Sequence, residues 1–302
     1  MIQPNRTITV SVSGAATAPA KTVNRGTSGP SNPARTIWPT TVIAIFITAI
    51  YCVGRSAQLS ARQSWMFILL LLVGLFLYLG ATISKRPLGI LIGSRNVMSL
   101  SRFQIVAWSL VVLSAFLTIA FRRIMGGASD PLNIPMDTQL WALMGISTAS
   151  LVGTPLILQN KATQNAHPDE VQSAAKNLGE SVSDVDSNRE GKLYANASIK
   201  DARLTDMFEG DEIGNTAFVD IAKVQMFLFT MIIIVAYCYQ VYSTLGQTLF
   251  DDHGKALLGL DGKRLIDTLG MPALSAGIVA LLGISHAGYL TSKTADHTPT
   301  PA

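Results

Sequence analysis

The stretch SRFQIVAWSLVVLSAFLTIAFRR, Ser101 to Arg123, decides the fold of this chain. Between Arg102 and Arg122 it runs through residues 103–121 without one Asp, Glu, Lys or Arg. A helix needs roughly 20 apolar residues to cross the hydrocarbon core of a bilayer, and a surface helix of a soluble protein carries a polar face. We therefore interpret this stretch as a transmembrane helix.

Five further apolar stretches without charged residues occur in the chain: 37–54, 64–83, 139–158, 224–245 and 270–290. Hydrophobic residues make up 49% of the 302 residues and charged residues only 14%, whereas an ordinary soluble domain has about 25% charged residues. The sequence predicts an all-α membrane protein with about six transmembrane helices.

Two short motifs occur twice. SLSRFQ at 99–104 matches DIAKVQ at 220–225, and ALMGIS at 142–147 matches ALLGIS at 280–285. Because both halves keep the same order and the same starting side, we expect hairpins at 99–158 and 220–293 to form a parallel repeat about an axis along the membrane normal. The N-terminal hairpin, 37–83, has no counterpart.

The first motif has the composition of a helix start. Ser99 and Asp220 are good N-cap residues, whose side-chain oxygens accept hydrogen bonds from the first free amides of a helix. Arg102 and Lys223 follow in the first turn. We expect their charged ends to remain at the membrane interface while their stems lie in apolar surroundings.

A glutamine follows one turn further in each motif. Gln104 and Gln225 could hydrogen-bond across a helix interface, which contributes about 0.6 kcal/mol on average in a membrane. They could equally reach back to headgroups or water, and the sequence leaves both interpretations open.

Small residues recur at four-residue spacing from the second motif onward. They are Gly145, Ala149 and Gly153 in one stretch and Gly283 and Ala287 in the other. Such spacing lets helix backbones approach closely. We expect the two helices to pack through these residues, either within one subunit or between copies.

The distribution of Lys and Arg predicts the orientation. With six crossings, residues 1–36, 84–102, 159–223 and the C-terminal tail lie on one side with 16 basic residues, and the other side has 7. The positive-inside rule then places both termini in the cytoplasm. Residues 1–36 have the composition of a disordered tail, and 294–302 form a short second tail.

The connection at 159–219 is predicted to be cytoplasmic and differs in composition. Residues 159–222 contain 12 acidic and 6 basic residues. A short helix is expected from Pro168 to Gly179, and another from Asp201 to a stop at Gly210. A small amphipathic unit of this kind must dock on its own bundle, on another copy or on a partner.

No motif indicates an enzyme. The chain has no Gly-rich phosphate loop after a strand, no nucleophile elbow and no HExxH motif. The run from Asp184 to Asn188 lacks the Gly and Glu that a calcium loop requires. His286 has no second histidine, carboxylate or thiol at helical spacing, so we interpret it as a polar residue near the interface. We expect no catalytic residues, no cofactor and no bound metal.

The paired elements SRNVMSLSRFQIVAW with LMGIS, and DIAKVQMFLFT with LLGISHAGYL, resemble a group of uncharacterised bacterial multi-pass membrane proteins. The resemblance covers about residues 85–155 and 200–293. It implies a setting in the bacterial cytoplasmic (inner) membrane and carries no known activity or site residue.

Two functions from different classes remain. The first is a membrane anchor or scaffold that assembles through its small-residue helices and presents the acidic loop to a partner. The second is a channel or transporter with a path between the repeated hairpins, lined by Gln104 and Gln225. The expected partners are the lipid bilayer, other copies of the chain and a cytoplasmic protein at 165–215, and no nucleic acid. A ligand sensor is a third reading, and no feature of the sequence separates it from the scaffold.

Overall fold

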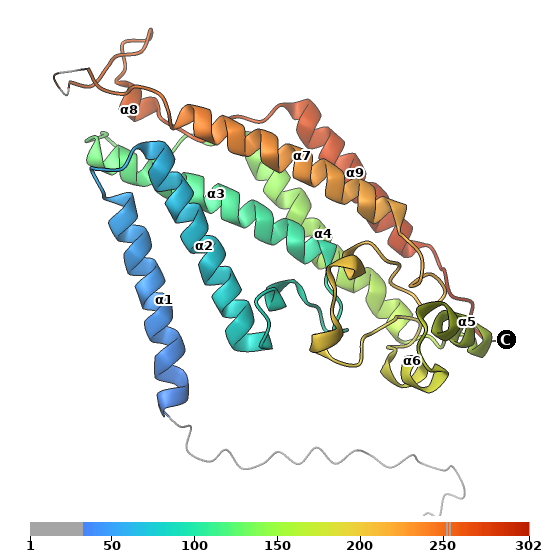
Figure 1. The fold of residues 1–302 in the computed structure, drawn as a ribbon. Helices are drawn as coiled ribbons and strands as arrows, with labels where there is room; N and C mark the ends of the chain where they lie inside the picture. The colour runs from blue at the N-terminus through green and yellow to red at the C-terminus, as the bar shows by residue number, and fades with distance from the viewer. Residues whose placement is uncertain (1–32, 252, 254, 302) are drawn as a thin grey trace, which may run out of the picture.

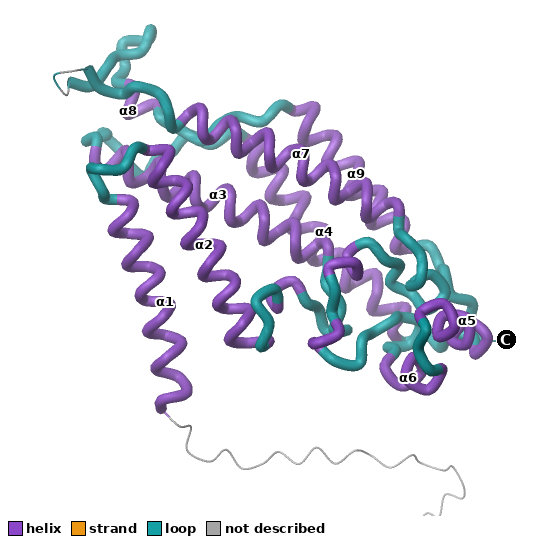
Figure 2. Tube along the Cα trace, in the orientation of Figure 1, coloured by secondary structure: helices purple, strands orange, loops and turns teal. Residues whose placement is uncertain are grey.

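The computed structural model describes residues 33–301 except 252 and 254, and this part of the chain is helical with no extended strands (Figure 2). The α-helices are α1 (Pro33–Gly54), α2 (Ala61–Ser84), α3 (Leu100–Met125), α4 (Thr138–Ala162), α5 (Pro168–Leu178), α6 (Val182–Asn188), α7 (Ile221–Thr244), α8 (Leu265–Thr268) and α9 (Ala276–Thr294). Short 3₁₀ turns lie at Gly89–Leu91, Ile199–Asp201 and Leu204–Met207. Most of the predicted tail at 1–36 lies outside the described residues, and its last four residues begin α1.

Four helices, α2, α3, α4 and α7, are long and apolar enough to cross a membrane. The described apolar part of α1 is shorter, Trp38–Gly54. Helix α9 is not among the four, since its last turn is polar and His286 interrupts its apolar run. The chain is therefore compatible with a multi-pass membrane protein.

Helices α3, α4, α7 and α9 form a four-helix bundle (Figure 1). α4 packs on α9 and α3 packs on α7, and each also packs on its hairpin partner. α4 and α9 run in the same direction, because Ser150 faces His286 and Thr154 faces Tyr289. α5, α6 and the C-terminus lie together at one end of this bundle, and α8 lies at the other (Figure 1).

The N-terminal hairpin joins the bundle through α2. Trp65 and Ile68 of α2 are buried, and the Trp65 indole donates to Ser114 Oγ of α3 at 3.0 Å. Arg122 at the far end of α3 donates to Leu59 O and to Ser64 Oγ. The hairpin is thus fixed to α3 at both the middle and the end of that helix.

The buried faces of the two hairpins match with a shift of one residue relative to the motifs. Buried Ser101, Gln104 and Trp108 of α3 correspond to buried Lys223, Met226 and Thr230 of α7, each 122 positions later. The motif spacing is 121. Each residue turns a helix by about 100°, so residues that the motif alignment pairs do not lie on equivalent faces of α3 and α7.

The last apolar stretch begins later than the sequence predicts. The helix runs over Ala276–Thr294 rather than 270–290, because Gly270 and Pro272 interrupt the pattern and Ser275 caps the start. Residues before it lie along a loop between α3 and α4, where Met271 N donates to Pro135 O at 2.9 Å.

Buried Arg123 organises the loops at the α8 end. Its guanidinium donates to the carbonyl oxygens of Asp130, Pro131, Asn133, Ile266, Asp267 and Leu269. One side chain therefore joins the loop after α3 to α8 and to the residue that follows α8.

Candidate functional site

The segment between α4 and α7, residues 163–219, is a small folded unit, and we call it the connecting unit. It has its own apolar core, formed by Ala166, Val171, Ala174, Ala175, Val185 and Ile213. The helix predicted from Pro168 is confirmed as α5, with Gly179 in the left-handed conformation that ends it. The second expected helix is only a 3₁₀ turn, Leu204–Met207, because Arg203 and Asp206 close a single turn around it.

The connecting unit is bound to the end of its own bundle. Lys161, in the last turn of α4, forms a 2.5 Å ion pair with Glu212, and Lys192 N donates to Lys161 O at 3.0 Å. Asn96 and Asn196 exchange hydrogen bonds, each side-chain amide donating to the other residue's carbonyl at 2.9 Å. Own-bundle docking is thus the arrangement that the structure adopts.

A single carboxylate, Asp211, lies at the centre of this contact and receives three cations. Arg95, in the loop before α3, donates to Asp211 Oδ1 at 2.7 Å. Lys223 of α7 lies 3.1 Å from Oδ2, and Lys293 of α9 pairs with the same oxygen. The Asp211 cluster therefore joins the connecting unit to one loop and two bundle helices.

Charge determines the protonation state of the Asp211 cluster. Burial by itself raises the pKa of the Asp211 carboxyl, but Lys223, Lys293 and Arg95 outweigh that effect and hold its pKa well below the usual range. Asp211 is consequently a carboxylate at every physiological pH. Without it, two buried ammonium groups would lose their counter-ion.

The C-terminal segment completes the connecting unit. Glu212 Oε2 accepts from His297 N at 3.0 Å, and Lys192 pairs with Asp296 at 2.6 Å. Thr298 is buried and its hydroxyl accepts from Gly214 N, while His167 N donates to Pro299 O at 3.0 Å. The segment predicted as a tail at 294–302 is packed rather than free over 295–299.

Many buried side chains of the bundle are polar in the region next to the Asp211 cluster, on the side away from the connecting unit. We call the buried side chains of this region the polar seam: Ser101, Gln104, Ser147, Ser150, Thr154, Thr230, Ser285, His286 and Tyr289. The interior further toward the α8 end is formed mainly by apolar side chains, among them Val111, Leu140, Leu143, Ile233, Val241, Val279 and Leu282. The half of the bundle core next to the connecting unit is thus polar and the other half is apolar.

Hydrogen bonds in the polar seam join helices both within one hairpin and between the two hairpins. Ser101 Oγ lies 3.1 Å from both Thr154 Oγ1 and Tyr289 OH. One turn deeper, the Gln104 amide donates to Thr230 Oγ1 at 2.6 Å. The two layers link α3 to α4, α9 and α7.

Several buried atoms in the seam have no hydrogen-bond partner within the part of the chain that the structure describes. They are Gln104 Oε1, Ser147 Oγ, Ser285 Oγ and His286 Nε2. Unpaired buried polar atoms are costly and uncommon, so each one calls for a physical reason. Four such atoms within the seam of a bundle whose helices are mostly apolar enough to span a membrane make the seam a candidate functional site.

The structure separates the four helix-start residues that the motifs align. Arg102 is exposed, as expected for an interface residue, and Asp220 caps α7 through the amides of Ala222 and Lys223. Lys223, in contrast, is buried and pairs with Asp211. Ser99 makes no side-chain cap bond.

The two glutamines also differ. Gln104 is buried and bonds across a helix interface, whereas Gln225 is exposed and makes no side-chain hydrogen bond to another described residue. Met226 takes the buried place instead, which follows from the one-residue shift of the buried face. Of the two interpretations that the sequence left open, Gln104 thus matches the bond across a helix interface and exposed Gln225 matches the other.

The small residues only partly mediate the contact of α4 with α9. A Cβ on Gly153 or Gly283 would make ordinary contact with the facing helix, at 3.6 Å from Leu290 or Ile146. Gly145, Ala149 and Ala287 are exposed. The contact is formed instead by the larger seam residues, which need no close backbone approach.

Sequence reasoning missed Asp211, Arg95 and Lys293, because an aspartate within an acidic loop is typical of a solvated residue. In the described ranges, no group of three or more His, Cys, Asp or Glu side chains is placed to hold a metal ion. No family model, no curated protein and no solved structure matches the chain.

Proposed function

We propose that this protein is a multi-pass membrane scaffold that holds a folded acidic unit at the cytoplasmic face of a bacterial inner membrane. In this proposal six helices cross the membrane, the hairpins 99–158 and 220–293 are repeat units, and both termini and the connecting unit are cytoplasmic. The proposal assigns no enzymatic role to the protein.

The observation that carries the proposal is the Asp211 cluster. Three cations from separate elements fix one carboxylate, so the connecting unit keeps a defined orientation on the bundle. A unit that only linked two helices would need neither a core of its own nor such an attachment. A fixed, folded unit is suited to present a surface to a partner.

The outer surface of the connecting unit is acidic. Exposed carboxylates on or beside α5 and α6 include Asp169, Glu180, Asp184 and Asp186. None of these four carboxylates belongs to the Asp211 cluster. The surface is thus complementary to a basic cytoplasmic protein.

The experiment compares partners of two neutralised variants. The full-length protein is extracted from its native membrane into lipid nanodiscs, and co-purifying proteins are quantified by mass spectrometry. The variant with Asp169→Asn, Asp184→Asn and Asp186→Asn should lose a stoichiometric partner. Asp130→Asn, an exposed carboxylate at the α8 end, should retain it. If the partners of both variants equal those of the wild type, the scaffold proposal fails.

The polar seam supports a second candidate, a channel or transporter with a path between the two hairpins. Ser101 and Thr154 of the seam also line a cavity that opens at the connecting-unit end, so the seam is reached from that side. The path then needs transient opening of the apolar half of the core.

Proton flux into proteoliposomes under a potassium diffusion potential tests this candidate. Gln104→Leu should abolish flux, whereas Gln225→Leu, on the exposed face of α7, should leave it unchanged. Absence of any flux of protons or small ions through the wild type would remove the candidate.

A further inference from the structure

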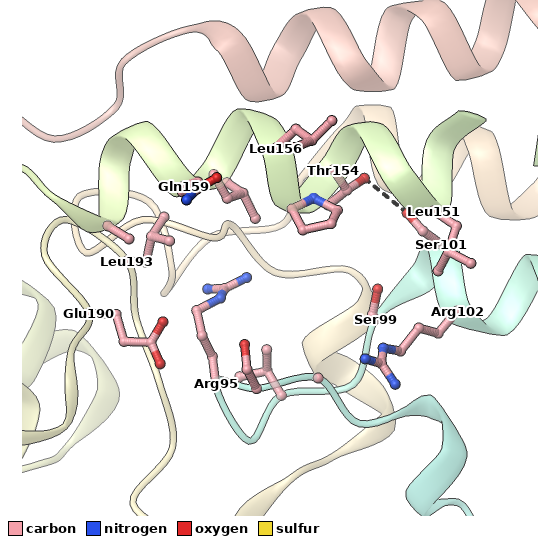
Figure 3. Close-up of a pocket in the computed structure, with 16 residues that line it drawn as sticks. Arg95, Ser99, Ser101, Arg102, Leu151, Thr154, Leu156, Gln159, Glu190 and Leu193 are labelled. Carbon is pink, nitrogen blue, oxygen red and sulfur yellow. Dashed lines mark hydrogen bonds between the residues drawn. The ribbon is translucent and has the colours of Figure 1, made fainter. Parts of the chain in front are cut away.

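A cavity of about 410 Å³ lies between the start of α3 and the last turns of α4 (Figure 3). The loop at 93–97 forms one side, and Glu190 and Leu193 of the connecting unit close another. The cavity thus lies where the membrane-spanning part of the bundle meets the connecting unit.

Its walls differ in chemistry. One wall is an apolar strip of α4 formed by Leu151, Pro155, Leu156 and Leu158. Leu156 is 61% exposed within a helix that is apolar enough to span a membrane, so this wall continues onto the lipid-facing surface. The opposite side carries Ser99 and Arg102. An occupant that fits both walls has an apolar part and a polar head.

The Glu190 carboxylate is unpaired among the described residues, and of the two arginines that line the cavity Arg102 is the one without a side-chain partner there. Its guanidinium makes no hydrogen bond or ion pair with any residue that the structure describes, whereas Arg95 on the other side is bound to Asp211. In Figure 3, Arg102 lies beside Ser99, and Glu190 lies at the opposite end of the cavity. The unpaired positive charge is thus well separated from the cavity's carboxylate.

The position of Arg102 in its helix makes an anion favourable there. It lies in the first turn of α3, where the helix dipole already contributes positive potential, and a cation is unfavourable at that end. A bound anion would offset both the charge of Arg102 and the positive potential at the start of α3. A guanidinium matches the geometry of a phosphate group, which it can bind through two parallel hydrogen bonds.

We propose that this cavity binds a membrane phospholipid, with its phosphate on Arg102 and its acyl chains along the Leu156 strip of α4. The shared chemistry is a phosphate ester. The apolar wall and the place of the cavity at the end of the spanning helices favour a lipid over a soluble phosphate. This binding site is independent of the scaffold proposal, because it requires no protein partner.

Native mass spectrometry of the purified full-length protein in detergent tests the proposal. Phosphatidylglycerol is titrated against wild type, Arg102→Gln and Arg203→Gln, the last an exposed arginine of the connecting unit outside the cavity. Arg102→Gln should weaken phosphatidylglycerol binding about tenfold, as expected for losing a charge-assisted phosphate contact. Arg203→Gln should bind like the wild type, and Arg102→Lys should keep part of the affinity.

Two further probes distinguish the sources of the phosphate. Diacylglycerol, which lacks the phosphate, should bind wild type and Arg102→Gln equally weakly. Glycerol phosphate, which lacks the chains, should not displace the lipid. Equal loss in Arg102→Gln and Arg203→Gln, or displacement by glycerol phosphate at matched concentration, would overturn the proposal.

Discussion

The Oγ atom of Ser150 on α4 lies 2.5 Å from the Nδ1 atom of His286 on α9, and both side chains are buried. The pair lies at the same depth in two helices that run in the same direction. His286 Nε2 has no partner within the described chain, so the ring uses only one of its two nitrogens. Of the hydrogen bonds between α4 and α9 in the described part of the chain, this one lies furthest from the connecting unit.

A double-mutant cycle measures this contact. We expect Ser150→Ala and His286→Ala to be coupled by about 0.6 to 1.7 kcal/mol, the range for hydrogen bonds between membrane helices. The measurement is reversible unfolding in bicelles. Thr148→Ala, an exposed hydroxyl that bonds only to its own helix, is the control and should change stability by less than about 0.5 kcal/mol. A coupling of zero would show that the pair does not hold α4 to α9.

Asp211→Asn should destabilise the attachment of the connecting unit by about 3 to 5 kcal/mol, because it leaves buried Lys223 and Lys293 without a counter-ion. Hydrogen exchange in nanodiscs would report this as faster exchange over 163–219, with little change in α2. Asp201→Asn removes an exposed carboxylate of the same unit and is the matched control. Equal exchange in both variants would contradict the central place of Asp211.

The pH dependence follows from the direction of the Asp211 pKa. Since the pKa in the folded protein lies below the unfolded value of about 3.9, the carboxylate contributes its full stabilisation above about pH 4. That contribution is lost as the pH falls further toward the folded pKa. The difference in melting temperature between wild type and Asp211→Asn should therefore be constant from pH 8 to 5 and shrink below about pH 4. A difference that already shrinks between pH 7 and 6 would show that the folded pKa is not depressed.

Cysteine labelling tests the orientation of α7. In a background with Cys52→Ser and Cys238→Ala, Gln225→Cys should react with a membrane-permeant maleimide, because residue 225 is exposed. Met226→Cys should remain unreactive, because residue 226 is buried beneath the Asp211 cluster. The reverse pattern would restore the motif alignment, in which Gln225 occupies the place of Gln104.

The long apolar helices were predictable because charge-free runs are long and local. Residues 103–121 lie within α3 and 139–158 within α4, and caps such as Asp220 added the starts. The predicted helix at 270–290 started too early, because the apolar run continues through Gly270 and Pro272. Hydropathy alone does not show that the backbone there is not helical. Composition therefore fixes where the chain is apolar and leaves the helix boundary to backbone chemistry.

The Asp211 cluster could not be predicted from spacing. Arg95, Asp211 and Lys293 are separated by about a hundred residues each, and Asp211 and Lys293 lie outside every motif quoted above. Only the packing of α9 beside α7 brings Lys223 and Lys293 to one carboxylate. The motif alignment also pairs exposed Gln225 with buried Gln104, because similarity between residues does not show which side of a helix faces the core.

The packed C-terminal segment has a consequence for the order of assembly. The connecting unit at 163–219 is made well before residues 295–299, yet Thr298 fills its interior and Glu212 is held by His297. During synthesis these contacts form only after α7, α9 and the segment behind them have been made. Closing contacts between segments so distant in sequence makes the last step slow. The connecting unit is thereby completed only after every helix of the bundle has been made.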